Sequence, residues 1–290
     1  MTADMIRIAL PNKGRLAESA RELLERAGLE LDMRDRALQA SLGPDVTALV
    51  VNARDIPEFV ADGAADVGIT GGDLVAEYGR DVVRLLDLGF GRCRLAVAAR
   101  DDSDITSIDD VPAGARVATV FPNLTRRYFE DLARSVTLVP ISGAAEIAPH
   151  IGLADIIVDL VSTGSTLKVN GLHEVATVLE SSALLIARAA VLDDLEAGGR
   201  VRELTTALES VLRAQGQRYL MANVPRGVLP EIKRILPGIN GPTIIDVLDG
   251  GEFVAAHAVV AQRDIYRTIA QLKQVGAQGI LVTKIERLMP

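Results

Sequence analysis

Short apolar runs alternate with helical patterns from the beginning of the chain, and this alternation restricts the folds that the chain can adopt. Ile6–Leu10 has the continuous apolar character of a buried strand, and Leu16–Ala27 repeats its apolar residues at helical spacing. A strand pattern at Val46–Val51, a helix pattern at Ile56–Ala61 and a strand pattern at Asp66–Thr70 follow. Strands and helices in this order form βαβ units around a mostly parallel sheet. The sequence therefore predicts an α/β fold.

The residues available for the core agree with this fold class. Hydrophobic residues make up 49% of the chain but aromatic residues only 3%, and tryptophan is absent. The core must therefore consist mainly of Val, Leu, Ile and Ala, which is typical of parallel sheets covered by helices. A length of 290 residues predicts two or three domains rather than one core.

Two pairs of segments resemble each other. Arg7–Asn12 resembles Arg116–Asn123, because each is a strand pattern that ends in Pro-Asn before a helix. Ala65–Gly71 resembles Ala154–Asp159, because each begins with Ala-Asp and leads along a strand to Thr-Gly. These repeats predict two similar α/β lobes. Two lobes imply a cleft, and ligands of open α/β sheets bind beyond the carboxyl ends of the strands.

A different pattern begins after an amphipathic helix at residues 193–215. The expected elements are a strand ending near Val224, a helix at Leu229–Leu236, strands at Thr243–Leu248 and Glu252–Val260 with a turn at Asp249–Gly251, a helix at Ile265–Val275 and a strand at Gly279–Ile285. This β-α-β-β-α-β order is the ferredoxin-like arrangement. We place the first lobe at 1–94 together with 186–215, the second lobe at 95–185 and this third domain at 216–290.

Charge and composition exclude several classes of function. A net charge of −8 gives no bulk attraction for nucleic acid, so an anionic ligand must be held by local groups. The single cysteine, Cys93, excludes an intramolecular disulfide, and His150, His173 and His257 lack the spacing of metal ligands. No basic segment followed by an apolar one opens the chain, and no apolar run has membrane-spanning length. We therefore expect a cytoplasmic protein without a membrane partner.

The strongest local indication of function follows the apolar run that ends near Asp159. The sequence continues with Ser162, Thr163, Gly164, Ser165 and Thr166 at the expected start of a helix. Gly164 permits a tight turn, and the free N–H groups and four hydroxyls there can hold a phosphate. The carboxylate of Asp159 can accept hydrogen bonds from ribose hydroxyls. An ordinary capped turn between a strand and a helix is the structural alternative.

A second indication is the segment Pro11–Arg15, which reads Pro-Asn-Lys-Gly-Arg directly after a strand. Lys13 and Arg15 suit anionic phosphates. A solvated helix start is the alternative, but cations oppose the helix dipole at this end, so an anionic partner would explain them. Thr70–Asp73 and Asn123–Arg127 are weaker indications of the same kind.

Taken in order, these segments resemble the ATP phosphoribosyltransferase family over nearly the whole chain. The matching segments are Pro11–Arg15, Gly68–Asp73, Pro122–Phe129 and Asp155–Leu167, with Ser142-Gly143, Glu146 and Gly152–Asp155 in addition. One position departs from the family, which often has an arginine two residues before the position of Arg54. This chain has Asn52 there.

The resemblance implies a two-lobed fold similar to type II periplasmic binding proteins, with the regulatory domain of the long form. It implies transfer of a phosphoribosyl group from 5-phosphoribosyl 1-diphosphate to N1 of ATP, which opens histidine biosynthesis. Mg²⁺ is expected to arrive with the diphosphate rather than in a cage of protein ligands. Inhibition by L-histidine and assembly into dimers and hexamers are also implied, with no nucleic-acid partner.

The resemblance also implies roles for individual residues. Lys13 and Arg15 meet the phosphates, Asp159 meets the ribose hydroxyls, and these three form the catalytic set. The Ser162–Thr166 loop receives the 5′-phosphate, while Asp73 and Asp155 orient ribose or support the loops. Histidine is expected to contact Asn223, Ile239, Thr243, Val259 and Gly279. The alternatives are a cytoplasmic, non-catalytic sensor of a nucleotide or sugar phosphate, and a phosphoribosyltransferase that uses a free base.

Overall fold

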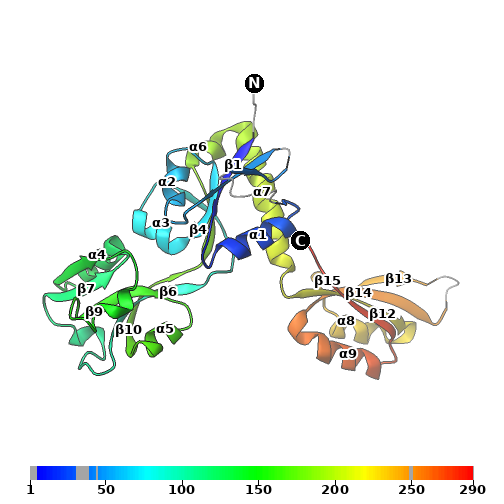
Figure 1. Cartoon of the computed structure of the whole chain (residues 1–290). Coiled ribbons are helices and arrows are strands. Elements are labelled where there is room, and N and C mark those ends of the chain that lie inside the picture. Colours follow the sequence, from blue (N-terminus) through cyan, green and yellow to red (C-terminus); the bar gives the residue numbers. More distant parts are fainter. Residues whose placement is uncertain (1–4, 31–38, 44, 248–250, 290) are drawn as a thin grey trace. The chain divides into compact units, whose positions relative to one another are not determined.

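Three β-sheets organise the chain in the computed structural model, which describes residues 5–30, 39–43, 45–247 and 251–289 (Figure 1). The chain divides into two units, Met1–Thr205 and Thr206–Pro290. The first unit contains a six-stranded and a five-stranded sheet, and the second contains a four-stranded sheet. The boundary between the units lies inside helix α7 (Leu195–Ala214), so the start of a third domain at residue 216 stays a prediction.

The six-stranded sheet belongs to the first lobe and has the order β2-β3-β1-β4-β11-β5. Its strands are β1 (Ile6–Pro11), β2 (Gln39–Ser41), β3 (Val46–Val51), β4 (Val67–Gly71), β5 (Val83–Asp87) and β11 (Ala183–Ala187). The helices of this part are α1 (Ala17–Arg26), α2 (Ile56–Ala61), α3 (Gly72–Tyr78) and α6 (Ala189–Asp193). The helix and strand patterns expected before residue 72 are confirmed to within a few residues.

The five-stranded sheet belongs to the second lobe and has the order β10-β6-β9-β7-β8. Its strands are β6 (Cys93–Arg100), β7 (Ala115–Thr119), β8 (Val136–Pro140), β9 (Ile156–Val161) and β10 (Leu172–Ser181). Helices α4 (Pro122–Asp131) and α5 (Ser165–Val169) and the short 3₁₀ helices Ile108–Asp110 and Ala145–Ile147 complete this lobe.

The two sheets have equivalent topologies. The order β3-β1-β4-β11-β5 in one corresponds to β8-β7-β9-β6-β10 in the other. In both, three parallel strands are followed by one reversed strand and then by an edge strand that runs in the direction of the first three. The repeated segments of the sequence lie on the equivalent pairs β1 and β7, and β4 and β9. The α/β class and the two similar lobes are confirmed.

Most strands of these two sheets run in one direction, as expected, but each of the two also contains a reversed strand inside it. Strands β6 and β11 run antiparallel to both of their neighbours, and the edge strand β2 is antiparallel to β3. The cause is the path of the chain, which crosses between the sheets after β5 and again after β10. A strand that arrives from the other lobe enters its sheet at the carboxyl edge of the parallel strands, and it must therefore run against them.

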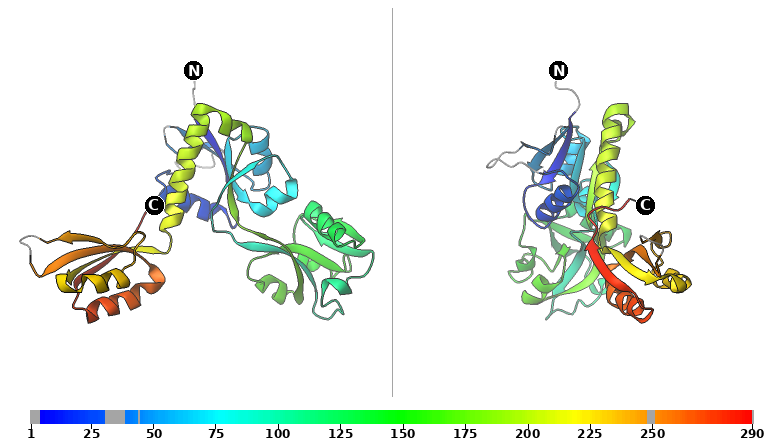
Figure 2. Two further views of the ribbon diagram at one scale, coloured as in Figure 1. Left: turned by 180° about the vertical axis from the view of Figure 1, so that it is seen from behind. Right: turned by 90° about the vertical axis from the view of Figure 1, so that its right-hand side faces the viewer.

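The two crossings are hydrogen-bonded to each other. The backbone N–H of Leu88 donates to the carbonyl of Ala183 at 2.9 Å, and the N–H of Ala183 donates to the carbonyl of Phe90 at 2.9 Å. Both crossings join the sheets at the edge where β1, β4, β7 and β9 end (Figures 1 and 2). The loops after these four strands are therefore available to form one site.

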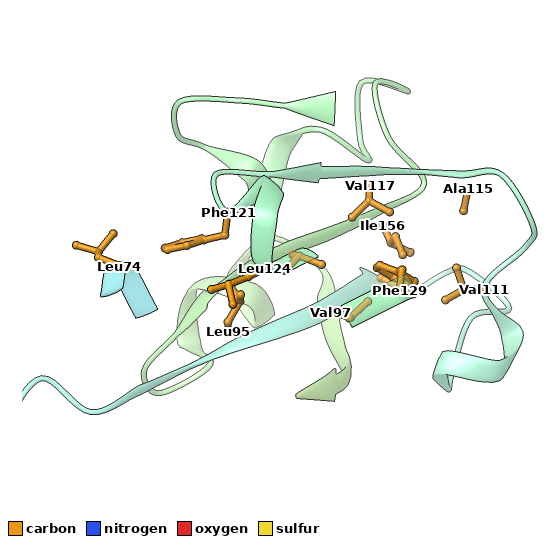
Figure 3. Packing of buried hydrophobic residues seen from close by; sticks show 12 residues of the cluster. Leu74, Leu95, Val97, Val111, Ala115, Val117, Phe121, Leu124, Phe129 and Ile156 are labelled. Atoms are coloured by element: carbon orange, nitrogen blue, oxygen red, sulfur yellow. The ribbon is translucent and has the colours of Figure 1, made fainter. Parts of the chain in front are cut away.

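The core of the second lobe is built around Phe129 of α4. Phe129 is 1% exposed and packs in one cluster with Val97, Val117 and Ile156 (Figure 3). Ile156 begins strand β9, and the loop at residues 162–166 follows the end of this strand. Packing of α4 therefore fixes the strand that carries the candidate phosphate loop.

The C-terminal unit is ferredoxin-like, as predicted. Its elements are β12 (Gln217–Pro225), the 3₁₀ helix Arg226–Val228, α8 (Leu229–Ile235), β13 (Thr243–Asp246), β14 (Phe253–Ala261), the 3₁₀ helix Gln262–Asp264, α9 (Ile265–Gln274) and β15 (Gln278–Lys284). The sheet order is β13-β14-β12-β15, all pairs are antiparallel, and α8 and α9 cover one face (Figure 1). Residues Leu248, Asp249 and Gly250, where the sequence predicts a strand end and a turn, lie outside the described residues.

Candidate active site

Loops from both lobes border a cavity of about 370 Å³. Its lining residues come from the ends of β1, β3 and β4 in the first lobe and of β7, β8 and β9 in the second; they are Lys13, Gly14, Arg15, Leu16, Asn52, Ala53, Arg54, Asp73, Leu74, Val120, Phe121, Gly143, Asp159 and Leu160. A smaller cavity of about 130 Å³ is lined by Glu146, by residues Ile157 and Asp159–Gly164, and by Thr166 and Leu167. Asp159 and Leu160 line both cavities, so the two adjoin.

The loop Ser162–Thr166 lies beyond the carboxyl end of β9 and leads into α5. Gly164 has a φ of 79°, a left-handed conformation that other residues adopt only with strain. The hydroxyls of Thr163 and Ser165 are 2.9 Å apart, and both side chains are exposed. Ser162, Thr163, Gly164 and Thr166 line the smaller cavity, while Ser165 does not. The loop thus presents a glycine and several hydroxyls to solvent beside Asp159.

The carboxylate of Asp159 is half-buried, and few groups of the protein stabilise its negative charge. Its Oδ1 accepts a hydrogen bond from the backbone N–H of Leu160 at 2.7 Å, and no cation within the described residues forms an ion pair with it. Burial raises the pKa of the Asp159 carboxyl above its ordinary value, and the negative charge of Glu146 adds to this effect. The Leu160 N–H and the charge of Arg54 act in the opposite direction. A carboxylate in this environment gains much from hydroxyl donors.

Arg15 and Asp73 form a network at the crossings between the lobes. Arg15 Nη2 lies 3.0 Å from Asp73 Oδ1, and Arg15 also donates to the carbonyl of Gly91 in the first crossing. The Ser181 hydroxyl donates to Asp73 Oδ1 at 2.7 Å and accepts from the Asp73 backbone N–H at 2.8 Å. Asp73 is 1% exposed. Its carboxylate is therefore engaged by Arg15 and Ser181, while Lys13 is exposed at the cavity.

The structure does not bring Asp155 to either cavity. Asp155 precedes the first residue of β9, at the end of the strand opposite the Ser162–Thr166 loop. Its Oδ2 accepts from the backbone N–H of Arg116 at 2.7 Å. In the first lobe, Oδ2 of Asp66 accepts from the N–H of Arg7 at 2.9 Å in the equivalent position. In each lobe, the aspartate of the repeated Ala-Asp pair therefore links two neighbouring strands. The repetition of the pair in the sequence was an indication of this structural role.

No motif of the sequence indicated a role for Glu77, a residue of α3 whose side chain binds the start of α4. The two carboxylate oxygens of Glu77 accept from the backbone N–H groups of Asn123 and Leu124 at 2.9 and 2.8 Å. The Pro-Asn segment at the start of α4 therefore faces a side chain of the protein itself. The equivalent Pro-Asn segment before α1 instead borders the larger cavity through Lys13 and Arg15.

The residues expected to bind histidine are distributed over the C-terminal sheet. Four of them lie on the face of the sheet opposite α8 and α9, one on each strand: Asn223 on β12, Thr243 on β13, Val259 on β14 and Gly279 on β15. The fifth, Ile239, lies in the turn before β13 and is 51% exposed. Asn223 and Gly279 are neighbours, because a Cβ atom on Gly279 would lie 3.4 Å from Asn223 Nδ2. Asn223 pairs with Ala255 and therefore lies about 13 Å along β14 from Val259.

The described residues contain neither a metal-ion cluster nor a membrane-spanning helix. Within residues 5–30, 39–43, 45–247 and 251–289, no group of three His, Cys, Asp or Glu side chains is arranged to hold a metal ion. None of the helices in that part of the chain has the length and apolar character needed to cross a membrane.

The fold places the chain in a class of two-lobed α/β proteins that carry a ferredoxin-like C-terminal domain. Residues 52–210 match the family model described as ATP phosphoribosyltransferase (HisG), and residues 214–287 match the HisG C-terminal domain. The chain therefore belongs to the ATP phosphoribosyltransferase family, and the resemblance seen in its motifs is confirmed.

Relatives match over almost the full length. The ATP phosphoribosyltransferase of Gemmatimonas aurantiaca is 60% identical, covering 99% of this chain and 100% of its own. That of Methanocaldococcus jannaschii is 46% identical, covering 98% and 100%. A chain of the ATP phosphoribosyl transferase (HisG:HisZ) complex from Thermotoga maritima superposes with a TM-score of 0.64 at 28% identity, covering 72% of this chain and 99% of that chain.

These findings establish a transferase of histidine biosynthesis whose substrates are ATP and 5-phosphoribosyl 1-diphosphate. They favour this enzyme over the non-catalytic sensor and over a phosphoribosyltransferase that uses a free base.

Proposed function

We propose that the cavity of about 370 Å³ and the adjoining Ser162–Thr166 loop together form the site of phosphoribosyl transfer. The observation that carries this proposal is the position of Asp159, which lines the cation-bearing cavity and the cavity of the loop at once. 5-Phosphoribosyl 1-diphosphate has a phosphate at one end of its ribose and a diphosphate at the other. In this site, Asp159 lies between the Ser162–Thr166 loop, which can bind the phosphate, and the cations Lys13 and Arg15, which can bind the diphosphate.

In the proposed reaction, adenine N1 of ATP attacks the anomeric carbon and forms the new N–C bond. The bond from this carbon to the diphosphate oxygen breaks, and the electron pair leaves with the diphosphate. Positive charge develops on the ribose, and negative charge develops on the leaving group. We assign Asp159 to the ribose hydroxyls and Lys13 and Arg15 to the diphosphate, because all three residues line the same cavity. Positioning and electrostatic stabilisation are therefore the main contributions of the protein.

We assign supporting roles to Asp73 and Asp155. Asp73 holds Arg15 and Ser181, and so keeps a cation at the edge of the cavity. Asp155 joins the starts of β7 and β9 through the N–H of Arg116. These contacts favour support of the loops over direct contact of either carboxylate with ribose.

Mg²⁺ fits this site as a companion of the substrate. Asp159 and Glu146 line the same small cavity, but the described residues contain no set of three acidic or histidine ligands. Mg²⁺ commonly binds through one or two carboxylates together with substrate phosphates and water. The ion would neutralise the diphosphate, and Asp159 is the carboxylate best placed to help hold it.

The role of the loop is tested at Gly164. Gly164→Val should weaken binding of 5-phosphoribosyl 1-diphosphate by about 10-fold or more, because a branched side chain blocks approach to the backbone and disfavours the φ of 79°. Calorimetry measures the affinity, and circular dichroism verifies the fold. Gly164→Ala is the matched control, since it has similar backbone strain with less bulk, and it should bind better than the valine variant. Unchanged affinity in a folded valine variant would remove the loop from the site.

We also propose that L-histidine inhibits the enzyme by binding to the C-terminal sheet near Asn223 and Thr243. Asn223 and Thr243 offer polar groups on the open face of this sheet, and Gly279 leaves room beside Asn223. Ile239 and Val259 would supply apolar contacts. Coupling to the catalytic unit requires two states of the enzyme that differ in histidine affinity, and typical coupling is about 1–3 kcal/mol.

Thr243→Ala should raise the histidine concentration needed for half-inhibition by about 5-fold or more, because it removes one hydrogen bond to the ligand. Steady-state assays with increasing histidine give this value. Thr283→Ala is the matched control, because Thr283 is exposed on β15 of the same sheet and lies outside the proposed set. Full histidine sensitivity in Thr243→Ala means that the pocket is misplaced, and an intact enzyme that ignores millimolar histidine means that the domain is structural only.

The remaining proposals concern assembly and location. We propose that the chain forms dimers and hexamers, and that it acts in the cytoplasm without a nucleic-acid or membrane partner. The net charge of −8 and the small-molecule substrates support the absence of a nucleic-acid partner.

A further inference from the structure

Helices α1 and α4 begin at equivalent places in the two lobes, yet their surroundings differ. The Pro11-Asn12 pair lies at the end of β1, before α1, and the Pro122-Asn123 pair lies after β7 and begins α4. The start of α1 borders the larger cavity. The start of α4 is covered by Glu77, which comes from α3 and therefore from the first lobe. One of two equivalent helix starts thus serves as a contact between the lobes.

The contact made by Glu77 is buried and uses the whole carboxylate. Glu77 is 5% exposed, and its two oxygens each accept one backbone N–H, from Asn123 and from Leu124. In the reverse direction, the side-chain amide of Asn123 donates to the backbone carbonyl of Glu77 at 3.2 Å. A negative charge at a helix start is favourable, because it satisfies free N–H groups and opposes the helix dipole.

Apolar packing and an arginine reinforce the same junction. Leu74 of α3 belongs to the core cluster of the second lobe and lies beside Phe121, at one side of the cluster (Figure 3). Arg127 of α4 donates to the carbonyl of Ala76 in α3. Leu74 of α3 is therefore inserted among buried residues that otherwise come from the second lobe, and Ala53 and Ala76 of the first lobe pack against them.

We infer that Glu77 is a positioning residue that sets the separation of the two lobes for catalysis. It holds α3 against α4, and α3 directly follows β4, whose neighbour β1 carries Lys13 and Arg15. Helix α4 follows β7, whose neighbour β9 carries Asp159 and the phosphate loop. This inference rests on the proposed site, because it concerns the distance between the cations of one lobe and the carboxylate and loop of the other.

Glu77→Gln tests the inference with almost no change of size. Glutamine has one acceptor oxygen, and its amide group would face the second backbone N–H donor, so one of the two contacts is lost. Since displacements of about 1 Å can reduce catalysis about 100-fold, kcat/KM should fall by roughly 10- to 100-fold. The matched control is Asp66→Asn, which removes a carboxylate that accepts a backbone N–H within one lobe, and it should change kcat/KM by less than about 3-fold.

A distance measurement separates positioning from general destabilisation. Spin labels are placed at exposed Arg21 of α1 and exposed Thr137 of β8 after each is changed to cysteine, and labelled chains are diluted with unlabelled ones. Cys93 is buried and does not compete for the label. The distance distribution between the labels should shift or broaden in Glu77→Gln and stay unchanged in Asp66→Asn.

The outcomes are distinct. An unchanged distance distribution in a folded Glu77→Gln enzyme overturns the inference, and so does a changed distribution with wild-type kcat/KM. The proposed site is tested separately by the Gly164 variants, in which the Glu77 contact is intact. Failure of the site proposal would therefore appear there, even if Glu77 does hold the lobes together.

Discussion

Asp159→Asn is expected to lower kcat/KM by roughly 10- to 1000-fold, the scale of losing one or two charge-assisted hydrogen bonds in the transition state. The substitution keeps the size of the side chain and removes the negative charge between the two cavities. Steady-state kinetics with ATP, 5-phosphoribosyl 1-diphosphate and Mg²⁺, in the presence of a diphosphatase, measure the effect. Wild-type kinetics would mean that Asp159 is only part of the strand.

The same substitution should stabilise the empty enzyme at neutral and higher pH. Burial raises the pKa of Asp159 in the folded state, so its contribution to stability is present below the ordinary pKa of aspartate. This contribution is lost as the pH rises through the raised folded-state pKa. Asparagine has no charge to desolvate. The Tm of the variant should therefore exceed that of the wild type at neutral pH, and the difference should shrink as the pH falls below the ordinary aspartate pKa.

Asp155→Asn is the matched comparison, because it makes the same change just before the same strand. Asp155 accepts a hydrogen bond from the N–H of Arg116 and lines neither cavity. Asp155→Asn should therefore lower the free energy of unfolding and leave kcat/KM close to that of the wild type. Equal losses of kcat/KM in the two variants would contradict the placement of the site at the carboxyl end of β9.

Phe129→Ala should lower the free energy of unfolding by about 3–5 kcal/mol, since it removes a fully buried aromatic side chain and leaves a cavity. Phe129 is 1% exposed within the core cluster of Figure 3. Urea denaturation followed by circular dichroism measures the change. Because Ile156 in this cluster begins β9, the variant should also lose affinity for 5-phosphoribosyl 1-diphosphate.

Leu132→Ala provides the control for Phe129→Ala. Leu132 follows α4 directly and is 40% exposed, so its truncation should cost less than about 1 kcal/mol. Similar losses in the two variants would show that the cluster around Phe129 is not the core of this lobe.

Much of the fold was predictable because its information is local. The buried strands β1, β3 and β4, the helices between them and the whole β-α-β-β-α-β order of the C-terminal unit follow from hydrophobic periodicity. The antiparallel strands were not predictable in the same way. Between β10 and β11 the chain passes from one sheet to the other at Ser182, without a glycine or proline to mark the change. Sheet membership there depends on partners distant in the sequence.

The candidate site shows the same division. The Ser162–Thr166 loop, Lys13 and Arg15 were identified from short motifs, and they line the cavities with the exception of Ser165. Asp155 lines neither cavity, because it is four positions before Asp159 and therefore lies about 13 Å away along the chain. Glu77 escaped notice because its partner Asn123 is 46 positions away and lies in the other lobe.

The central position of β11 has a consequence for the order in which the newly made chain acquires its structure. Strand β11 lies between β4 and β5, but the ribosome delivers it only after all five strands of the second sheet. The second sheet consists of consecutive strands and can close as soon as Ser181 has emerged. Until then β4 has an unpaired edge, and β5 has no partner among the described strands already made. The lobe synthesised first therefore matures last, and chaperones that shield exposed strand edges should act on this nascent chain mainly between the emergence of β5 and that of β11.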